Sequence, residues 1–460
     1  MKKNEIDMCS GPLLGKMITF AVPLMLTMVL QQLFNTADLV VVGEFGHKGA
    51  LAAVGATGSV VSLFVNFFGG LSLGAGICMA RYYGQKNEKE ASDCVHTSIL
   101  LSLIVGVFGA ALSMAFVRPL LEIMATPEEV IDQSEIYMLI YFAGMPFMLL
   151  FNFCAAMLRS VGDSKRSLYY ISSAGVINII LNLIFVVVFD LNVAGVAIAT
   201  VISQIFSAAL CVRCFLKYDG FLHLDLKKLR IDKKQLKEIV AMGLPGGIQG
   251  SLFSISNMLI QSSINSFGLA VMSGSTAAAN IEGYIYLILN SIASTATTFA
   301  GQNFGALKFK RIYKVMFISF AMQLICGLVL GVFVNLLPNE LIGLYTKIPE
   351  EIAAGKIRMM FICLPYFFCG FMDTCSGIIK GICHPIASMI VSLMGACVFR
   401  IVWIFTIFKA YRSLEVLFVS YPISWATTLA VHMIMLVYFM RKDEKKYSAE
   451  IRAADEITVR

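Results

Sequence analysis

The chain has 460 residues, of which 58% are hydrophobic and only 14% charged, and its formal net charge is +7. Its mean hydropathy of +0.80 is too high for a soluble globular protein of this length, so the composition indicates a polytopic membrane protein. The modest excess of Lys and Arg gives no reason to expect nucleic-acid binding.

Apolar stretches long enough to cross a bilayer as a helix recur twelve times. They lack the period-2 alternation of barrel strands, so helices are the expected spanning element. In chain order, the predicted spans are 14–43, 52–80, 94–117, 134–158, 167–189, 193–215, 239–264, 276–300, 312–336, 354–379, 386–408 and 414–440. The sequence therefore predicts an all-α polytopic membrane protein with twelve transmembrane helices.

The positive charges predict how the chain is oriented. If the N-terminus is cytoplasmic, the inner segments hold 27 of the 36 Lys and Arg residues, and the outer loops hold five. Because positive charge accumulates on the cytoplasmic side, we expect a multi-pass protein of the cell membrane with both termini in the cytoplasm.

The two halves of the chain repeat each other. The stretch from Phe20 to Gly84 is echoed by the stretch from Met242 to Gly305, with Pro23 and Pro245 222 positions apart. Such a duplication predicts a transporter of two six-helix lobes, at 1–216 and 239–440. The basic segment 217–238 is then a cytoplasmic linker, expected to be partly an amphipathic surface helix, and 441–460 a cytoplasmic tail.

Known enzyme motifs do not fit this chain. Gly70-Leu-Ser-Leu-Gly74 matches the GxSxG pattern of hydrolases, but its serine lies in an apolar helical run rather than a strand-turn-helix elbow. The same residues form a GxxxG pattern, which favours close helix packing. No P-loop or HExxH occurs, so we expect neither an enzyme nor a cofactor. Energy would come from an ion gradient or, less simply, from a partner protein, although no obligatory partner is evident.

Four charged residues lie deep within predicted spans, where each needs a partner or a wet cavity: Asp38, Glu282, Asp373 and Arg400. Asp38 shares one helix face with Gln31 and Asn35, at i, i+4 and i+7. A carboxylate in such a stripe can bind a proton or a cation, with amide oxygens completing the shell. The competing interpretation is a structural hydrogen-bond network between helices.

A second polar face is predicted in the fifth span, where Asn178 and Asn182 are four residues apart. If this span and the sixth pack against the first, Thr200 and both asparagines would join Asp38. For the asparagine pair alone, structural hydrogen bonding and ion handling are both compatible with the pattern.

Glu282 and Arg400 lie at similar estimated depths, about 10 to 15 Å from the outer face, so they are candidates for an ion pair. Such a pair would either gate a cavity or hold helices together. Asp373 lies deeper and is an alternative partner for Arg400, or a second site for a cationic substrate. The 34 Phe, 16 Tyr and 25 Met residues suit a promiscuous pocket for planar organic cations.

These residues resemble the MATE (multidrug and toxic compound extrusion) transporters over about residues 10 to 440. Beside Pro23, the resemblance is carried by Gln31-Gln-Leu-Phe-Asn-Thr-Ala-Asp38, Leu51-Ala-Ala-Val-Gly55, Ala80-Arg-Tyr-Tyr-Gly84, Arg159-Ser-Val-Gly-Asp163, Val193-Ala-Gly-Val-Ala-Ile-Ala-Thr200 and Gly301-Gln-Asn-Phe-Gly305. The resemblance implies two six-helix lobes around a central cavity and export of organic cations in exchange for Na⁺ or H⁺. It also implies cation coupling at Asp38, with Na⁺ as one candidate ion.

The chain departs from the family pattern at two positions. In the archaeal and DinF-like branch, Asn178, Asn182 and Thr200 match the partners of the aspartate, but Asn182 replaces an aspartate of that branch. In the NorM-like branch a glutamate lies early in the seventh span, where this chain has Phe253. A two-carboxylate network in the first lobe is therefore not available, and Glu282 or Asp373 would have to supply any cation site in the second lobe.

The leading hypothesis is a secondary antiporter in which Asp38 binds the incoming ion. Coupling then requires that ion and substrate favour different states of the protein. An alternative is a flippase or exporter of a lipid-linked or other metabolite, which would need a strongly cationic cavity, whereas Arg400 is the only basic residue placed deep in a span. A major-facilitator transporter would show a DRxGRR-like loop, which Arg81-Tyr-Tyr-Gly-Gln-Lys-Asn87 does not match.

Overall fold

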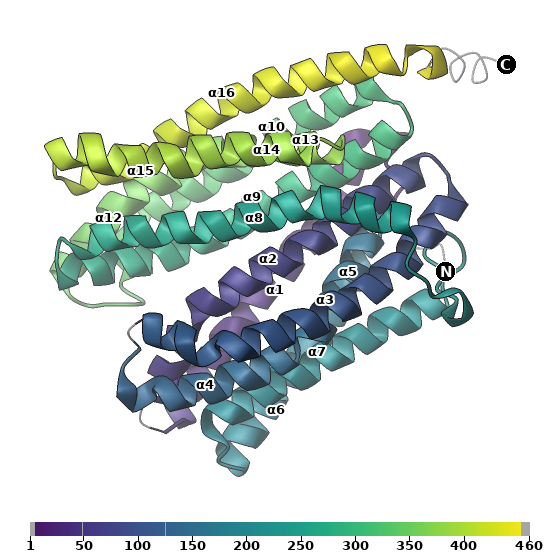
Figure 1. Ribbon diagram of the computed structural model, residues 1–460. Helices are drawn as coiled ribbons and strands as arrows, with labels where there is room; N and C mark the ends of the chain where they lie inside the picture. Colours follow the sequence, from purple (N-terminus) through teal and green to yellow (C-terminus); the bar gives the residue numbers. More distant parts are fainter. Residues whose placement is uncertain (1–4, 48, 125, 452–460) are drawn as a thin grey trace. The chain divides into compact units, whose positions relative to one another are not determined.

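The computed structural model describes residues 5–47, 49–124 and 126–451, and every regular element within them is helical (Figure 1). Residues 1–4 of the predicted N-terminal arm and 452–460 of the predicted tail lie outside the described residues. The all-α fold class predicted from the sequence is therefore confirmed.

The twelve predicted spans correspond to helical segments. Among the described residues, nine helices are long and apolar enough to cross a membrane, and two further spans are bent helix pairs. The remaining predicted span, 276–300, lies within the 37-residue helix α9 (Leu269–Gly305). The two bent spans were predicted as single helices. They are α4 (Glu128–Ala143) with α5 (Met145–Ser160), bent by 48°, and α12 (Pro349–Cys363) with α13 (Tyr366–Gly381), bent by 44°.

Proline explains both bends. Pro146 occupies the first turn of α5, and Pro365 is the N-cap of α13. A proline has no backbone N–H to donate, and its ring clashes with the preceding turn, so a continuous helix is interrupted there. Each bent pair therefore behaves as one span made of two shorter helices.

The chain forms two compact units, and two of its helices are each divided between them. Unit 1 comprises residues 1–7 and 22–251, and unit 2 comprises 8–21 and 252–460. Helix α1 (Leu13–Phe45) therefore begins in unit 2 and continues in unit 1, while α8 (Lys233–Asn265) begins in unit 1 and continues in unit 2. Both helices contain an internal proline, Pro23 in α1 and Pro245 in α8.

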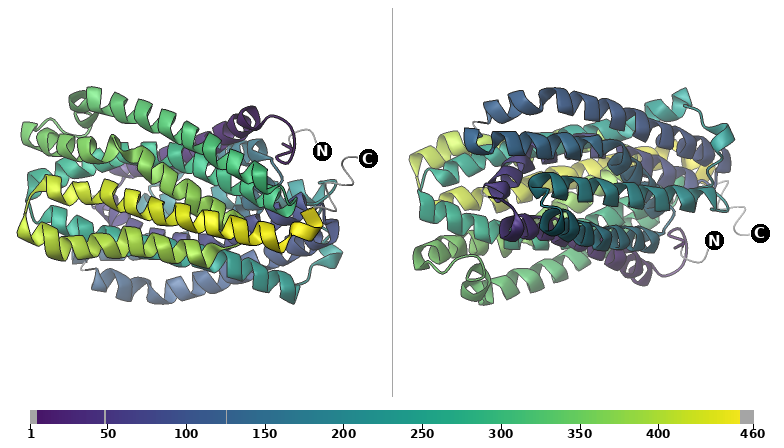
Figure 2. Two further views of the ribbon diagram at one scale, coloured as in Figure 1. Left: turned by 90° about the horizontal axis from the view of Figure 1, so that it is seen from above. Right: turned by 90° about the horizontal axis from the view of Figure 1, so that it is seen from below.

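Unit 1 is completed by four long helical segments besides α4, α5 and the shared helices. They are α2 (Ala50–Gly84), α3 (Glu88–Ile123), α6 (Ser164–Leu183) with the π-helix η2 (Ile184–Val188), and α7 (Asn192–Leu216). Figures 1 and 2 show these helices running alongside one another within the unit.

Unit 2 contains α9, α12 and α13 together with three further long helical segments. They are α10 (Phe309–Leu336), followed by the short α11 (Pro338–Ile342); the run of α14 (Pro385–Ser392), η4 (Leu393–Val398), α15 (Phe399–Trp403) and η5 (Ile404–Phe408); and α16 (Leu414–Lys446).

Glycines allow the backbones of α2 and α8 to approach closely within unit 1. A Cβ atom added at Gly70 of α2 would lie 2.2 Å from the backbone nitrogen of Gly247 in α8, and one at Gly74 would lie 2.3 Å from the Ile239 carbonyl oxygen. Ser72 Oγ donates to the Gly69 carbonyl oxygen of its own helix at 2.6 Å. The Gly70–Gly74 stretch thus serves helix packing, as the GxxxG interpretation predicted.

The linker differs from the predicted surface helix. Within 217–238 the only helical parts are the 3₁₀ turn η3 (Leu226–Lys228) and the first turns of α8. The charged side chains are instead held by carboxylates of α3, since Lys234 Nζ donates to Glu90 Oε1 at 2.7 Å and Arg230 Nη2 to Asp93 Oδ1 at 3.0 Å. These ion pairs attach the segment to unit 1, so the charges do not form the polar face of a separate helix.

Candidate functional site

The structure brings Asp38 together with the three predicted partners from α6 and α7. Asn182 Nδ2 donates a hydrogen bond to Asp38 Oδ1 at 2.5 Å, and Thr200 Oγ1 donates to Asp38 Oδ2 at 3.4 Å. Asn178 Nδ2 lies 3.4 Å from Thr200 Oγ1, and Asn178 Oδ1 accepts from Asn182 Nδ2 at 3.4 Å. We call Asp38, Asn178, Asn182 and Thr200 the Asp38 cluster.

A close contact between α1 and α6 positions this cluster. A Cβ atom added at Gly175 would lie 1.9 Å from the Phe34 ring, so glycine leaves room for this α1 side chain against α6. Asp38 follows Phe34 by four residues and Asn182 follows Gly175 by seven, which places both side chains on the contacting faces. The π-helix η2 begins directly after Leu183. Such π segments are frequent at functional sites.

The environment of the cluster is polar but largely closed to solvent. Asn182 is completely buried and Asn178 is 5% exposed, while Asp38 is partly exposed. The Asn182 Oδ1 atom is buried without a hydrogen-bond partner in the described part of the chain. A buried amide oxygen of this kind can accept from water or ligate a cation. The oxygens beside Asp38 are hard ligands, which suit Na⁺ as well as a bound proton.

Two tyrosines near Asp38 were not predicted from the sequence. Tyr137 and Tyr141 of α4 are both close enough to interact electrostatically with its carboxylate. Their rings stack on each other with centroids 6.0 Å apart. Their i, i+4 spacing within the predicted span 134–158 was the available signal, but many aromatic pairs in this chain have the same spacing.

The remaining members of the predicted polar stripe behave differently from Asp38. Gln31 and Asn35 are exposed, and neither side chain makes a hydrogen bond within residues 5–47, 49–124 and 126–451. The stripe therefore reaches the interior of unit 1 only at Asp38.

In unit 2, the predicted pairing of Glu282 with Arg400 is wrong. Glu282 instead pairs with Arg358 of α12, whose Nη2 and Nε atoms donate to Glu282 Oε2 at 2.9 and 3.1 Å. Arg358 Nη1 also donates to Ser275 Oγ at 2.9 Å, and Tyr366 Oη donates to Glu282 Oε1 at 3.3 Å. The helices rotate Arg358 rather than Arg400 towards Glu282, and similar depth alone could not reveal this.

Arg400 and Asp373 form no ion pair with each other among the described residues. Arg400 Nε donates to Ser424 Oγ at 2.9 Å, and the guanidinium lies over the Tyr421 ring, 4.0 Å from its centroid. Asp373 is partly exposed, and Cys369 Sγ lies 4.0 Å from its Oδ2. Asp373 therefore retains a carboxylate that no cation of the described chain neutralises directly.

The sequence of this chain matches the family MatE twice, over residues 23–184 and 245–406. The chain belongs to the MatE family. The two matched segments are offset by 222 positions, which is the repeat seen from Pro23 to Pro245. MatE proteins are transporters, so the prediction that this protein is not an enzyme is confirmed.

Named relatives of this MatE transporter align over nearly its whole length. The probable multidrug resistance protein YoeA of Bacillus subtilis is 28% identical over 422 residues, covering 90% of this chain and 91% of its own. The probable multidrug resistance protein NorM of Thermotoga maritima is 25% identical, covering 89% of each chain.

Solved structures support the same fold. An outward-facing multidrug resistance MATE family transporter matches with a TM-score of 0.88 at 21% identity, covering 95% of this chain and 98% of the other. At this identity the match establishes the fold, and it confirms the architecture of twelve transmembrane helices in two lobes. This MatE transporter is thus a polytopic membrane protein.

Proposed function

We propose that this MatE transporter is a secondary antiporter that exports organic cations in exchange for H⁺ or Na⁺. The observation that carries the proposal is the Asp38 cluster, in which a carboxylate within a membrane span receives hydrogen bonds from Asn182 and Thr200. No ion pair neutralises Asp38 among the described residues. A carboxylate held by neutral groups can exchange a proton or a sodium ion, which a permanent ion pair would prevent.

The coupling follows from the hydrogen bonds that the ion would change. Binding of a proton or Na⁺ at Asp38 alters the bonds to Asn182 and Thr200, which join α1 to α6 and α7. The ion therefore stabilises one arrangement of these helices more than another. An organic cation that prefers the other arrangement would drive exchange, because coupling requires differential affinity for two states.

The other predicted site residues keep subordinate roles in this proposal. Gln31 and Asn35 are exposed on the same helix as Asp38 and are candidates to contact substrate. In unit 2, Asp373 is the candidate carboxylate for a second cation, while Glu282 is already neutralised by Arg358. Arg400 is held by Ser424 and Tyr421, which favours a role in holding α15 and α16 together over a gate.

The orientation belongs to the same proposal. Both termini are proposed to lie in the cytoplasm. With this orientation, most Lys and Arg residues fall in segments on the inner side of the cell membrane. The boundaries at 1–216, 217–238, 239–440 and 441–460 remain the proposed functional division of the chain. No partner is proposed beyond small organic cations and the bilayer.

The deciding experiment is efflux of a fluorescent organic cation from proteoliposomes under an imposed pH or Na⁺ gradient. We expect transport with one of the two gradients, which names the ion, and loss of ion-driven transport in Asp38→Asn. The matched control is Glu44→Gln, an exposed carboxylate on the same helix, which should transport like the wild type. Unchanged transport in Asp38→Asn would refute coupling at this residue.

A flippase or an exporter of lipid-linked metabolites has less support. Such a protein needs free cationic groups in its interior. Arg358 is hydrogen-bonded to Glu282 and Ser275. Arg400 donates from Nε to Ser424 and stacks on the Tyr421 ring. Absence of organic-cation transport under both gradients would favour this alternative.

A further inference from the structure

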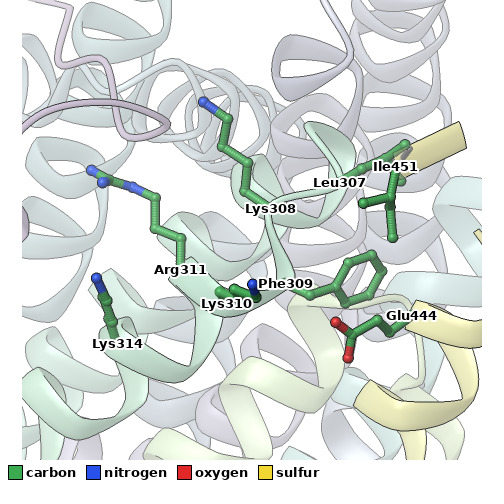
Figure 3. Close-up of a pocket in the computed structure, with 8 residues that line it drawn as sticks. All are labelled: Leu307, Lys308, Phe309, Lys310, Arg311, Lys314, Glu444 and Ile451. Carbon is green, nitrogen blue, oxygen red and sulfur yellow. The ribbon is translucent and has the colours of Figure 1, made fainter. Parts of the chain in front are cut away.

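The first turns of α10 carry an unusual concentration of uncompensated positive charge. A cavity of about 440 Å³ lies there, lined by Lys308, Lys310, Arg311 and Lys314 with Glu444, Leu307, Phe309 and Ile451. Figure 3 shows the cationic side chains emerging from the start of α10, while Phe309 and Glu444 lie towards the end of α16. Four cations and one carboxylate therefore line this cavity.

Neighbouring groups within unit 2 account for only part of this charge. Lys308 Nζ donates to the Cys9 carbonyl oxygen at 2.9 Å, and Arg311 donates to the carbonyl oxygens of Met8, Ser10 and Gly11 at 3.1, 2.6 and 2.9 Å. Carbonyl oxygens hold these side chains without neutralising them. Lys310 and Lys314 are exposed and form no ion pair or side-chain hydrogen bond within the described part of the chain.

The corresponding helix start in unit 1 shows the usual arrangement. Helix α3 begins with Asn87 as N-cap and has Glu88 and Glu90 in its first turn. Negative charge there stabilises the helix, whose N-terminus carries a partial positive charge. Helix α10 has no side-chain cap and no acidic residue in its first turn. An external anion would supply the negative charge that α3 carries in its own sequence.

The position of the cavity relative to the bilayer indicates which anion is available to it. From Val315 to Leu336, α10 has 22 residues without a charge. As a helix these span about 33 Å, close to the ~30 Å hydrocarbon thickness of a bilayer. Lys308 to Lys314 therefore lie at the level of the lipid headgroups. Leu307 and Ile451, both partly exposed, add an apolar border suited to the glycerol and upper acyl region of a lipid.

We propose that this cavity binds the phosphodiester headgroup of an anionic phospholipid. Basic pockets at the ends of membrane helices recognise such headgroups through charge and hydrogen bonding. Lys310 and Lys314 contact the phosphate, while Lys308 and Arg311 hold residues 8–11 beside it. Bound lipid would thereby stabilise the segment that enters α1.

The test measures lipid binding rather than transport, so its result does not depend on the proposed antiport. The purified full-length protein is titrated with short-chain phosphatidylglycerol, and binding is followed by the rise in melting temperature. Phosphatidylcholine and inorganic phosphate form the two comparison arms. We expect stabilisation by phosphatidylglycerol alone, because the site requires both the anionic group and its position at the membrane surface.

The decisive variant is Lys310→Gln with Lys314→Gln. Since each basic residue near a membrane surface contributes roughly a fivefold change in affinity, the pair should weaken phosphatidylglycerol binding about 30-fold. The matched control is Lys227→Gln with Lys237→Gln, two exposed lysines of unit 1, which should bind as the wild type does. Equal binding by the decisive variant, or an equal loss in the control, would overturn the site. Stabilisation by inorganic phosphate as strong as by the lipid would overturn the lipid assignment.

Discussion

The Asp38 cluster of unit 1 has no carboxylate or amide counterpart at the repeated positions of unit 2. Ile260, 222 positions after Asp38, is apolar and 1% exposed. The repeat offset is 221 or 222 positions. At these offsets, Asn178 corresponds to Phe399 or Arg400, Asn182 to Trp403 or Ile404, and Thr200 to Tyr421 or Pro422. The same scaffold thus holds carboxylate and amide groups in one unit and mainly aromatic and aliphatic groups in the other.

The backbone of the two halves remains similar despite this difference. Lys86 and Leu307 both adopt positive φ, at 55° and 57°, and Gly162 and Cys383 do so as well, each pair 221 positions apart. The π-helix η2 in unit 1 is likewise echoed by η5 in unit 2. The comparison teaches that duplication preserved the helix geometry while side chains diverged, so coupling through an Asp38-type cluster is expected in unit 1.

The largest expected effect is on the stability of unit 2 and comes from Arg358→Met. This change leaves the Glu282 carboxylate buried without its cation, which should cost about 3–5 kcal/mol of unfolding free energy. Thermal unfolding of the purified protein measures the loss. Because both side chains are about nine-tenths buried, solvent screening reduces the effect little.

A double variant separates structure from coupling. Arg358→Met with Glu282→Gln removes both charges, so most of the stability should return and ion-driven efflux should keep its wild-type ion dependence. A double variant that is stable but no longer responds to the ion gradient would place coupling in unit 2, contrary to the comparison.

The next effect is on ion affinity and comes from Asn182→Leu. The substitution removes the short hydrogen bond to Asp38 while keeping a similar volume, and hydrogen bonds to charged groups contribute about 1.5–3 kcal/mol. The ion concentration for half-maximal efflux should change by roughly 10- to 150-fold. Trp403→Phe, in the corresponding stretch of unit 2, removes the bond to the Val416 carbonyl oxygen and should leave this concentration unchanged. Similar shifts in both variants would contradict the confinement of coupling to unit 1.

The helix contact that supports the cluster can be tested at Gly175. Gly175→Ala introduces a Cβ that meets the Phe34 ring, so the ring must move from its place against α6, at an expected cost of about 1–3 kcal/mol. Melting temperature should fall and ion affinity should change, and Phe34→Leu in the same chain should restore part of each. Gly283→Ala in α9, where no atom lies within 4 Å of the added Cβ, is the control. Failure of Phe34→Leu to restore either property would show that the Phe34 contact is not the cause.

The sequence predicted the Asp38 cluster better than it predicted the charges of unit 2. Asn178 and Asn182 must share a helix face whatever the surroundings, and polar groups in apolar helices meet because hydrocarbon offers them no other partner. The choice of Arg358 over Arg400 for Glu282 depends instead on how each helix is rotated about its axis. Helix rotation follows from packing of the whole unit, and spacing within one span does not encode it.

The linker shows a second limit of the sequence pattern. Its lysines and arginines resemble the polar face of a surface helix, but Arg230 and Lys234 pair with Asp93 and Glu90, more than a hundred residues earlier. A charge run therefore predicts solvent exposure only when no distant carboxylates compensate it. The uncompensated lysines at the start of α10 differ from this segment for the same reason.

The smallest expected effect is on ion affinity and comes from Thr200→Val, which removes the longest hydrogen bond to Asp38. Thr200 Oγ1 lies 3.4 Å from Asp38 Oδ2 but also donates to the Val196 carbonyl oxygen of its own helix at 2.9 Å. A single hydroxyl proton cannot fully serve both acceptors, so the contact with Asp38 should contribute only about 0.5–1 kcal/mol. We expect ion affinity to change about two- to fivefold, falling for Na⁺ and rising for H⁺, against no change for Tyr421→Phe in unit 2. A loss of Na⁺ affinity as large as the change expected for Asn182→Leu would instead mean that the Thr200 oxygen ligates the ion directly, which a proton-only site does not require.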